Sequence, residues 1–448
     1  TMFSKILIAN RGEIALRIIR AARELEVATV CVFSEADANA PWLELADERV
    51  CIGKGPSADS YLRIDRIISA AEMTNAQAIH PGYGFLAENA HFAEVCRDCE
   101  IEFIGPSPEA MERLGDKINC KRLAKKAGTP IFPGTDGAIE ELDEAITIAS
   151  EIGYPVIVKA TAGGGGKGMR IARNASDLQS AVTAAQQEAI ASFGNGAVYL
   201  EKFLENARHV EVQVLGDKHG NAVHLYNRDC TSQRRHQKLI EEGPAPGVDP
   251  QVRDRVCESA AELIREANYS GAATVEFLMN KEQEFYMLEV NTRVQVEHPV
   301  TEMITGVDIV KESIRVAAGE PLSWKQEDIK VNGHAIECRL NAEDPSKNFM
   351  PQPGTIDTWE IAGGPGVRIE SHVRAGYKIP PNYDSMIGKL IVHGRDRTEA
   401  IARMRAALGE MKIGPIATTI PLNQNLINQP AFINADFDIN WVERYLEE

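Results

Sequence analysis

Short apolar segments alternate with amphipathic segments over the first quarter of the chain, and this alternation constrains the fold most strongly. Residues 5–9 and 29–33 are apolar enough for strands, and residues 14–25 between them repeat apolar residues at helical spacing. The pattern continues through the segments 50–53, 64–71, 76–80 and 102–105. Strands and helices that alternate in this way predict a parallel, doubly wound α/β sheet over residues 1–113. The first loop, Asn10–Glu13, lacks the G-x-G-x-x-G of a dinucleotide site, which argues against a dehydrogenase.

The rest of the chain changes character twice. We expect a helix over residues 109–127 and a helical linker over 114–131. A smaller unit follows over residues 132–203, with expected helices at 142–152 and 175–193 between short strands. Residues 204–448 are strand-rich, with interleaved helices, and predict an α+β unit.

The chain is acidic, which narrows the classes of partner. Its 65 Asp and Glu residues against 48 Lys and Arg residues give a formal charge of −17, and such a surface repels the phosphates of nucleic acids and anionic lipids. The eight cysteines are scattered, as in proteins of reducing compartments. No apolar run approaches the ~18 residues of a membrane span. We therefore expect a cytoplasmic protein that binds neither nucleic acid nor membrane.

The most informative segment is Glu289–Glu297, in which polar and apolar residues alternate strictly. If the segment is a strand, successive side chains point to opposite faces, and one face carries Glu289, Asn291, Arg293, Gln295 and Glu297. That face offers oxygen ligands for a metal ion, a guanidinium for an anion and a carboxylate base. A half-exposed strand with ordinary polar-outward alternation is the competing interpretation.

A neighbouring segment strengthens the functional interpretation. Thr274–Leu278 places the carboxylate of Glu276 among apolar residues, where it is unfavourable unless paired or coordinated. Glu276 and Glu289 on adjacent strands would suit magnesium, which prefers oxygen donors and keeps substrate phosphates in its shell. We expect the strand that carries Glu289 to end only at His298–Pro299.

A run of four glycines, Gly163–Gly166, follows a strand that ends near Lys159. Glycine amides can form a phosphate-binding nest, and such a loop can close over a ligand as a lid. The run lacks the G-K-[S/T] ending of a Walker A loop. A plain mobile hairpin is the alternative.

Two more segments are candidates for ligand contact. The cluster Gln233–Lys238 concentrates positive charge in an acidic chain, and an anion site and a solvated loop explain it equally well. His80–Phe85 follows a predicted parallel strand at its carboxyl end, where α/β sheets bind ligands. His80 itself fits a buried structural histidine as well as a functional one.

The informative segments occur together and in a fixed order: residues 8–15, 80–89, 163–169, 228–242, 289–302 and 383–390. This series resembles the biotin carboxylases, the subunits or domains of acetyl-CoA, pyruvate and acyl-CoA carboxylases, over essentially the whole chain. The resemblance implies an ATP-grasp fold with four parts. These are an N-terminal doubly wound parallel-sheet domain (1–113), a helical linker (114–131), a central lid domain (132–203) and a C-terminal α+β catalytic domain (204–448).

The resemblance also implies roles for individual residues. The ATP phosphates would contact Lys117, Lys159, Gly165 and Gly166, and the adenine would contact a hinge of Glu201, Lys202 and Leu204. Further nucleotide contacts would come from His209, Gln233 and His236. Magnesium or manganese ions would be bound by Glu276, Glu289 and Asn291. Bicarbonate would be held by Lys238, Arg293, Gln295 and Val296 and deprotonated by Glu297, while biotin would meet Arg339 and Tyr83.

The reaction so implied is the ATP- and bicarbonate-dependent carboxylation of biotin on a biotin carboxyl carrier protein. The implied partners are that carrier, carboxyltransferase subunits and a second copy of the chain, with Arg20 and Glu24 near the dimer interface. Acetyl-CoA carboxylase and fatty acid synthesis are the expected setting, and a pyruvate or propionyl-CoA carboxylase is the alternative. Rival functions are another ATP-grasp ligase, such as a carbamoyl phosphate synthetase, and a catalytically silent nucleotide-binding subunit.

Overall fold

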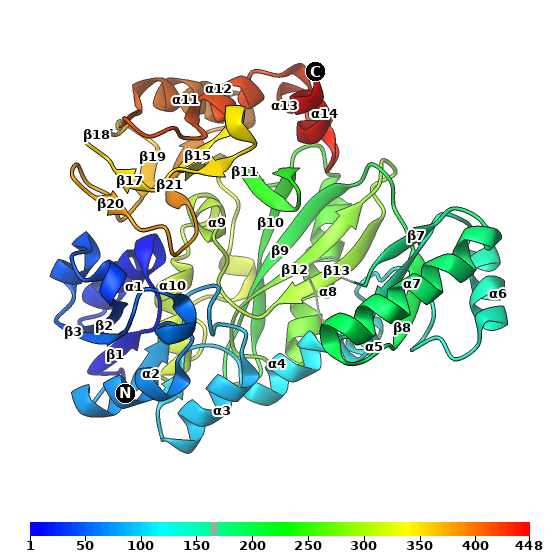
Figure 1. The fold of residues 1–448 in the computed structure, drawn as a ribbon, viewed down its shortest axis with the longest axis horizontal. Coiled ribbons are helices and arrows are strands. Elements are labelled where there is room, and N and C mark those ends of the chain that lie inside the picture. The colour runs from blue at the N-terminus through cyan, green and yellow to red at the C-terminus, as the bar shows by residue number, and fades with distance from the viewer. Residues whose placement is uncertain (163–167) are drawn as a thin grey trace.

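The computed structural model describes residues 1–162 and 168–448 (Figure 1). Its N-terminal part is a five-stranded sheet in the order β3-β2-β1-β4-β5, and every pairing in it is parallel. The strands are β1 (Lys5–Ile8), β2 (Ala28–Ser34), β3 (Glu48–Gly53), β4 (Ala78–His80) and β5 (Glu102–Phe103). Helices α1 (Gly12–Glu24), α2 (Ile64–Thr74) and α3 (Ala90–Asp98) lie between them in the chain. The predicted parallel α/β sheet is confirmed.

Two helices, not one, cover the stretch after this sheet. Helix α4 (Pro108–Gly115) ends before Asp116, and α5 (Lys117–Ala127) begins after it. The Asp116 side chain accepts a hydrogen bond from the amide of Asn119 and so caps α5. The single helix predicted over 109–127 is wrong because Asp116 adopts an extended backbone, which ends one helix and starts the next.

The central unit is a small three-stranded antiparallel sheet with two helices packed on it. The strand order is β7-β6-β8, from β6 (Val156–Ala160), β7 (Arg170–Ala172) and β8 (Val198–Lys202). The helices are α6 (Leu142–Ile152) and α7 (Ala175–Phe193), as predicted. This unit projects from one side of the molecule in Figure 1.

An eight-stranded antiparallel sheet forms the middle of the molecule in the order β13-β12-β9-β10-β11-β14-β21-β19 (Figure 1). Its strands are β9 (Arg208–Gly216), β10 (Ala222–Arg234), β11 (Gln237–Gly243), β12 (Gly271–Met279), β13 (Phe285–Asn291), β14 (His334–Asn341), β19 (Val367–Glu370) and β21 (Met386–Gly394). Helices α8 (Pro250–Glu266), α9 (His298–Thr305), α10 (Ile309–Ala317) and α11 (Arg397–Glu410) pack against it. The sheet therefore brings residues far apart in the sequence onto adjacent strands.

Small elements complete the C-terminal part. They are β15 (Glu343–Asp344), β16 (Met350–Pro351), β17 (Gly354–Thr355), β18 (Thr358–Glu360), β20 (Lys378–Ile379), β22 (Lys412–Gly414), α12 (Ile420–Ile427), α13 (Pro430–Ile433) and α14 (Trp441–Glu447). Within the described residues, we find no helix that combines the length and apolarity needed to span a bilayer.

Candidate active site

A cavity of about 1100 Å³ opens where the three parts of the fold meet. Its lining comes from the loop after β1 and the segment after β4, from the small central sheet, and from β9 to β14 of the large sheet. Most residues expected to form the site lie on its wall: Tyr83, Lys117, Lys159, Lys202, Leu204, His209, Gln233, His236, Lys238, Glu276, Glu289, Asn291, Arg293, Gln295, Val296, Glu297 and Arg339. Gly165 and Gly166 lie outside the described residues.

Glu276 and Glu289 are directly opposite each other on the paired strands β12 and β13. Burial, followed by the neighbouring Glu276, raises the pKa of the Glu289 carboxyl to about 7. The pair thus carries negative charge that nearby cations only partly offset. Asn291, at the end of β13, adds an amide oxygen on the same cavity wall. A divalent cation that prefers oxygen ligands fits this donor set and would relieve the repulsion.

Lys238, the second residue of β11, lies among three buried carboxylates. Its Nζ is 2.9 Å from Glu211, 3.0 Å from Glu276 and 2.6 Å from Glu297. Burial alone would lower the pKa of the Lys238 ammonium, but the three carboxylates raise it well above its ordinary value. Lys238 is therefore a permanent positive charge at the cavity wall.

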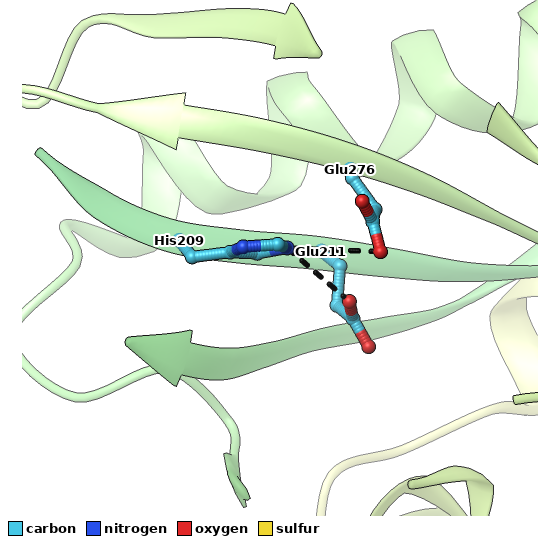
Figure 2. A group of neighbouring side chains, drawn as sticks. All are labelled: His209, Glu211 and Glu276. Atoms are coloured by element: carbon cyan, nitrogen blue, oxygen red, sulfur yellow. Dashed lines mark ion pairs between the residues drawn. The ribbon is translucent and has the colours of Figure 1, made fainter. Parts of the chain in front are cut away.

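His209 adds a second cation beside two of these carboxylates. Figure 2 shows His209 and Glu211 on β9, with Glu276 on the neighbouring β12. Nε2 of His209 is 3.5 Å from Glu211 and 3.7 Å from Glu276. Burial would lower the pKa of His209, but Glu276 and Glu211 outweigh it and raise the pKa to about 9. The imidazole is thus charged at neutral pH, with Nε2 facing both carboxylates.

Glu297 lies between two cations at the start of α9. Its Oε1 is 2.6 Å from Nζ of Lys238, and its Oε2 accepts a hydrogen bond of 3.1 Å from Nη2 of Arg339. The side chain is only 2% exposed but borders the cavity. Arg339, on β14, is held in turn by Glu241 of β11 through a 2.6 Å hydrogen bond from Nε. Both oxygens of the Glu297 carboxylate are thus held by cations at the cavity wall.

The segment 292–297 is a loop, so the predicted strand over Glu289–Glu297 is wrong beyond Asn291. Its side chains reach the same cavity by individual hydrogen bonds and not by strand alternation. Nε of Arg293 donates to Glu88 at 3.2 Å, and Glu88 also accepts from the amide of Thr292 at 3.0 Å. His298 does not end a strand; it begins α9.

Gln295 and Val296 are fixed at the base of this loop. Gln295 donates to Glu276 at 3.1 Å and accepts from the fully buried Arg228 at 2.8 Å. The carbonyl of Val296 accepts a 2.7 Å hydrogen bond from Lys389. These contacts pin the backbone between Arg293 and Glu297.

The opposite wall of the cavity offers two lysines and an apolar surface. Burial, followed by the nearby Lys159, lowers the pKa of Lys117. Lys159 pairs with Glu201 at 2.9 Å, so the Glu201 side chain orients a lysine and does not line the cavity. Lys202 and Leu204 do line it, next to a surface that suits a flat apolar ring: Phe132, Ile157, Met169, Tyr199, Leu278, Leu288 and Ile439.

The basic cluster Gln233–Lys238 forms the hairpin between β10 and β11. Its turn residues Arg235 and His236 have positive φ angles of 48° and 63°, which is uncommon for such residues and aims the turn at the cavity. Gln233, His236 and Lys238 line the cavity, whereas the guanidinium of Arg234 lies 3.8 Å from the centre of the Phe349 ring.

In the segment His80–Phe85, Tyr83 borders the cavity and His80 does not. His80 is buried and accepts a hydrogen bond from the amide of Gly82, and burial, followed by Arg17, lowers its pKa to about 3. This environment is that of a structural histidine. Tyr83 lines the cavity and its hydroxyl contacts Glu13.

Sequence reasoning missed several residues of the site, notably Glu211, Arg228, Glu241 and Glu88. Glu211 had a usable signal, because Val210–Val214 alternates valine with Glu and Gln just as the segment around Glu276 does. Arg228 lies in the segment 228–242, but no residue pattern singles it out, because its partners Glu211 and Gln213 come from another strand.

Three comparisons with known proteins find similarity to biotin carboxylases over nearly the whole chain. Residues 2–111 and 337–444 match the biotin carboxylase N-terminal and C-terminal domain families, and residues 116–325 match the carbamoyl-phosphate synthase L chain ATP binding domain. Biotin carboxylase 1 of Bacillus subtilis is 53% identical over 445 residues, 99% of each chain. A biotin carboxylase from Campylobacter jejuni, solved as a β,γ-ATP complex, is similar with a TM-score of 0.94 at 50% identity over 99% of each chain. The biotin carboxylase domain dimer of Hydrogenobacter thermophilus 2-oxoglutarate carboxylase, solved with MgADP and bicarbonate, has a TM-score of 0.92 at 48% identity, covering 99% of this chain and 98% of that one.

Proposed function

The chain belongs to the biotin carboxylase family of ATP-dependent ligases. From this premise we propose which of its residues bind the substrates and which carry out the reaction. The activity is the ATP- and bicarbonate-dependent carboxylation of biotin. The ATP-binding middle resembles that of carbamoyl-phosphate synthases, but both flanking regions match biotin carboxylases. One observation carries the residue assignment: Glu297 is a buried carboxylate held between Lys238 and Arg339 at the cavity wall.

The nucleotide occupies the side of the cavity formed by the central unit. Lys117 and Lys159 contact its phosphates, and the Gly165–Gly166 loop is assigned to them from sequence alone. Lys202 and Leu204 contact the adenine, with Glu201 at the same hinge. His209, Gln233 and His236 complete the nucleotide contacts.

Glu276, Glu289 and Asn291 would hold magnesium or manganese. When bound, the cation neutralises charge on the phosphates during transfer. Without it, the protein's own cations Lys238 and His209 already offset Glu276 from the other side.

Bicarbonate binds between Arg293, Gln295, the Val296 backbone and Lys238, next to Glu297. Glu297 takes the bicarbonate proton, and the resulting oxyanion attacks the γ-phosphorus of ATP as ADP departs. The product is carboxyphosphate. Positioned cations are the main source of rate in such a transfer, since little covalent chemistry falls to the protein.

Carboxyphosphate then breaks down to CO2 and phosphate, and the phosphate takes the N1 proton of biotin. The biotin enolate so formed attacks CO2. Arg339 faces the cavity beside Glu297 and stabilises the enolate, and Tyr83 lies near the biotin ring. Closure of the central unit keeps water from the intermediate.

ADP release tests this assignment. It is measured with magnesium, ATP and bicarbonate, with and without free biotin, for the wild type, Glu297→Ala and the exposed control Glu327→Ala. We expect bicarbonate-dependent, biotin-stimulated ADP release that falls by a factor of about 10² or more in Glu297→Ala alone, the size usual for losing a general base. Turnover that survives the Glu297 change would overturn the assigned base, and turnover indifferent to biotin would overturn the residue scheme.

The setting we propose is acetyl-CoA carboxylase, in the cytoplasm, with a biotin carboxyl carrier protein and carboxyltransferase subunits as partners. The acceptor is inferred from the resemblance of segments such as 228–242 and 289–302 to acetyl-CoA carboxylase subunits, and eight unpaired cysteines suit a reducing compartment. Carboxyl transfer to acetyl-CoA, propionyl-CoA, pyruvate or 2-oxoglutarate in extracts containing the partners distinguishes the acceptors. Transfer to an acceptor other than acetyl-CoA would contradict the proposal.

We also propose a homodimer through the face that carries Arg20 and Glu24 of α1. Arg20 pairs with Glu370 and Glu24 pairs with Lys311, but the two side chains remain 50% and 61% exposed and so can contact a second copy. Sedimentation equilibrium should give twice the 49.1 kDa chain mass. Arg20→Glu should shift the equilibrium to monomer, and a wild type that sediments as a monomer would refute the dimer.

A further inference from the structure

Behind Arg339, on the face of the large sheet that carries it, lie two buried glutamates with no role in the scheme above. Glu241 of β11 and Glu337 of β14 are directly opposite each other in the antiparallel register. Both are 0% exposed. Side chains directly opposite on such a pair have β-carbons about 4.5–5.5 Å apart, so the two carboxyl groups are neighbours.

The hydrogen bonds of the two groups are unequal. Glu241 accepts from Nε of Arg339 at 2.6 Å through one oxygen. Its other oxygen, and both oxygens of Glu337, contact no hydrogen-bond donor among the described residues. Three buried acceptor oxygens without a donor are highly unfavourable if both groups are ionised.

Four charged groups face Glu337 from the elements around it: Glu241, Arg339, Lys389 and Glu297. Lys389 is engaged elsewhere, since its Nζ is 3.1 Å from Glu13 and 2.7 Å from the Val296 carbonyl. Arg339 forms ion pairs with Glu241 and Glu297. Among the described residues, neither cation forms a hydrogen bond or an ion pair with Glu337, whose two oxygens stay without a donor.

Adjacent buried carboxyl groups share a proton because both cannot ionise without great cost. Glu241 is the ionised member because it accepts from Arg339. Burial and the neighbouring Glu241 raise the pKa of Glu337 well above its ordinary value, in keeping with the geometry. Burial also raises the pKa of Glu241, but Arg339 opposes that effect.

We propose that Glu337 is a neutral carboxylic acid that donates a hydrogen bond to Glu241 and so positions Arg339 for the reaction. This inference rests on the proposed role of Arg339. Glu337 touches no reacting atom and is a positioning residue. Its proton fixes Glu241, Glu241 fixes Nε of Arg339, and Nη2 is left for Glu297 and the biotin enolate. If Glu337 were ionised instead, its charge would compete with Glu297 for Arg339.

Infrared spectroscopy tests the protonation state directly. Spectra are taken with 13C-labelled glutamate and saturating MgADP at about pH 8, where an ordinary glutamate is ionised. We expect a carbonyl band of a protonated carboxylic acid in the wild type that disappears in Glu337→Gln and persists in the exposed control Glu327→Gln. A wild type without the band overturns the inference, even if no Glu337 variant folds.

A pair of variants tests the positioning role. Glu337→Gln keeps a donor toward Glu241, whereas Glu337→Leu removes it. We expect biotin-dependent kcat to be at least about tenfold lower in Glu337→Leu than in Glu337→Gln, with KM for ATP unchanged, since one lost charge-assisted hydrogen bond is worth about that factor. Equal kcat in the two variants would contradict the role. Failure of the proposed base would appear separately, as turnover that survives in Glu297→Ala while the infrared band remains.

Discussion

The ammonium of Lys238 lies 2.6 Å from Oε1 of Glu297, the shortest of its three contacts with buried carboxylates. The lysine thus contacts the proposed base Glu297, Glu276 of the proposed metal-binding pair Glu276 and Glu289, and Glu211. The contact fixes the position of the Glu297 carboxylate at the cavity wall. The ammonium also offers charge to the bicarbonate oxygens that arrive beside it. Lys238 links both halves of the proposed first step, proton removal and phosphoryl transfer.

Lys238→Met should damage both catalysis and stability. The change leaves three carboxylates without their common cation, and breaking a buried pair from one side costs about 3–5 kcal/mol. Glu211 and Glu276 owe their lowered pKa values to Lys238 despite burial. In the variant these carboxyl groups bind protons more readily, so the loss of unfolding free energy should be largest at alkaline pH and shrink as the pH falls. Urea unfolding across this range measures the effect.

The matched control for this prediction is Lys412→Met, since the Lys412 side chain is 70% exposed and lies near Glu360 at the surface. We expect it to change the unfolding free energy by less than about 1 kcal/mol. If Lys238→Met were no more destabilising than Lys412→Met, the view of Lys238 as the charge centre of the site would be wrong.

Glu88→Gln should weaken bicarbonate binding without affecting ATP. Glu88 accepts from Nε of Arg293 and from the Thr292 amide, which fixes the start of the loop 292–297 that we propose to bind bicarbonate. The Glu88 side chain is 42% exposed, so the pair contributes only about 1 kcal/mol or less, which corresponds to a rise in KM for bicarbonate of roughly fivefold. Steady-state kinetics at fixed ATP measure it, with the exposed Glu94→Gln as the control. A rise in KM for ATP instead would place Glu88 in a different role.

Much of the fold was predictable because the spacing of apolar residues along the chain indicates which side of each strand or helix is buried. The parallel N-terminal sheet follows from its alternation, and helices α6 and α7 begin and end at the predicted residues. The predicted bounds of helices and strands were wrong where polar side chains interrupt the apolar periodicity. Strand β10 runs on through Arg228 and Asp229 because other buried groups pair with them, and such long-range pairing leaves no local signal.

The residues of the site likewise divide into those with a local sequence signal and those that only long-range pairing brings together. Residues on strands with one polar side chain among apolar ones, such as Glu276, were identifiable from the chain alone. Strand alternation predicted that Arg293–Glu297 belongs to the site, but this reasoning was wrong because the segment is a loop and not a strand. In this loop Val294 is buried in the core, whereas Val296 borders the cavity, so the alternation does not report which side chains form the site. Glu241 and Glu337 could not be predicted, since only the β11–β14 register brings them together.

Glu289→Gln should raise the magnesium requirement. The change removes one of the two carboxylates of the metal-binding pair and with it part of the charge that attracts a divalent cation. We expect the magnesium concentration for half-maximal ADP release to rise about tenfold, equivalent to about 1.4 kcal/mol of binding free energy. Glu284→Gln, near the start of β13, serves as the control. Unchanged magnesium dependence in Glu289→Gln would remove Glu289 from the ligand set.

Glu242→Gln should reveal a pH-dependent stabilisation outside the cavity. Glu242 is buried and pairs with His334 at 2.6 Å and with Nε of Arg397 at 2.8 Å. Burial would raise its pKa, but these partners lower it from 4.5 to about 2. A carboxyl group with a lowered folded pKa stabilises the protein above its unfolded pKa, and the effect is lost as the pH falls toward the folded value. A shift of this size corresponds to roughly 3 kcal/mol at neutral pH.

The wild type should therefore be more stable than Glu242→Gln by about that amount at pH ~7, and the difference should narrow as the pH falls from about 4.5 toward 2. Denaturant unfolding at several pH values measures both curves. Glu360→Gln, on an exposed side chain, controls for the loss of one surface charge. A constant difference at all pH values would mean that Glu242 contributes by packing and not by its charge, because packing has no dependence on protonation.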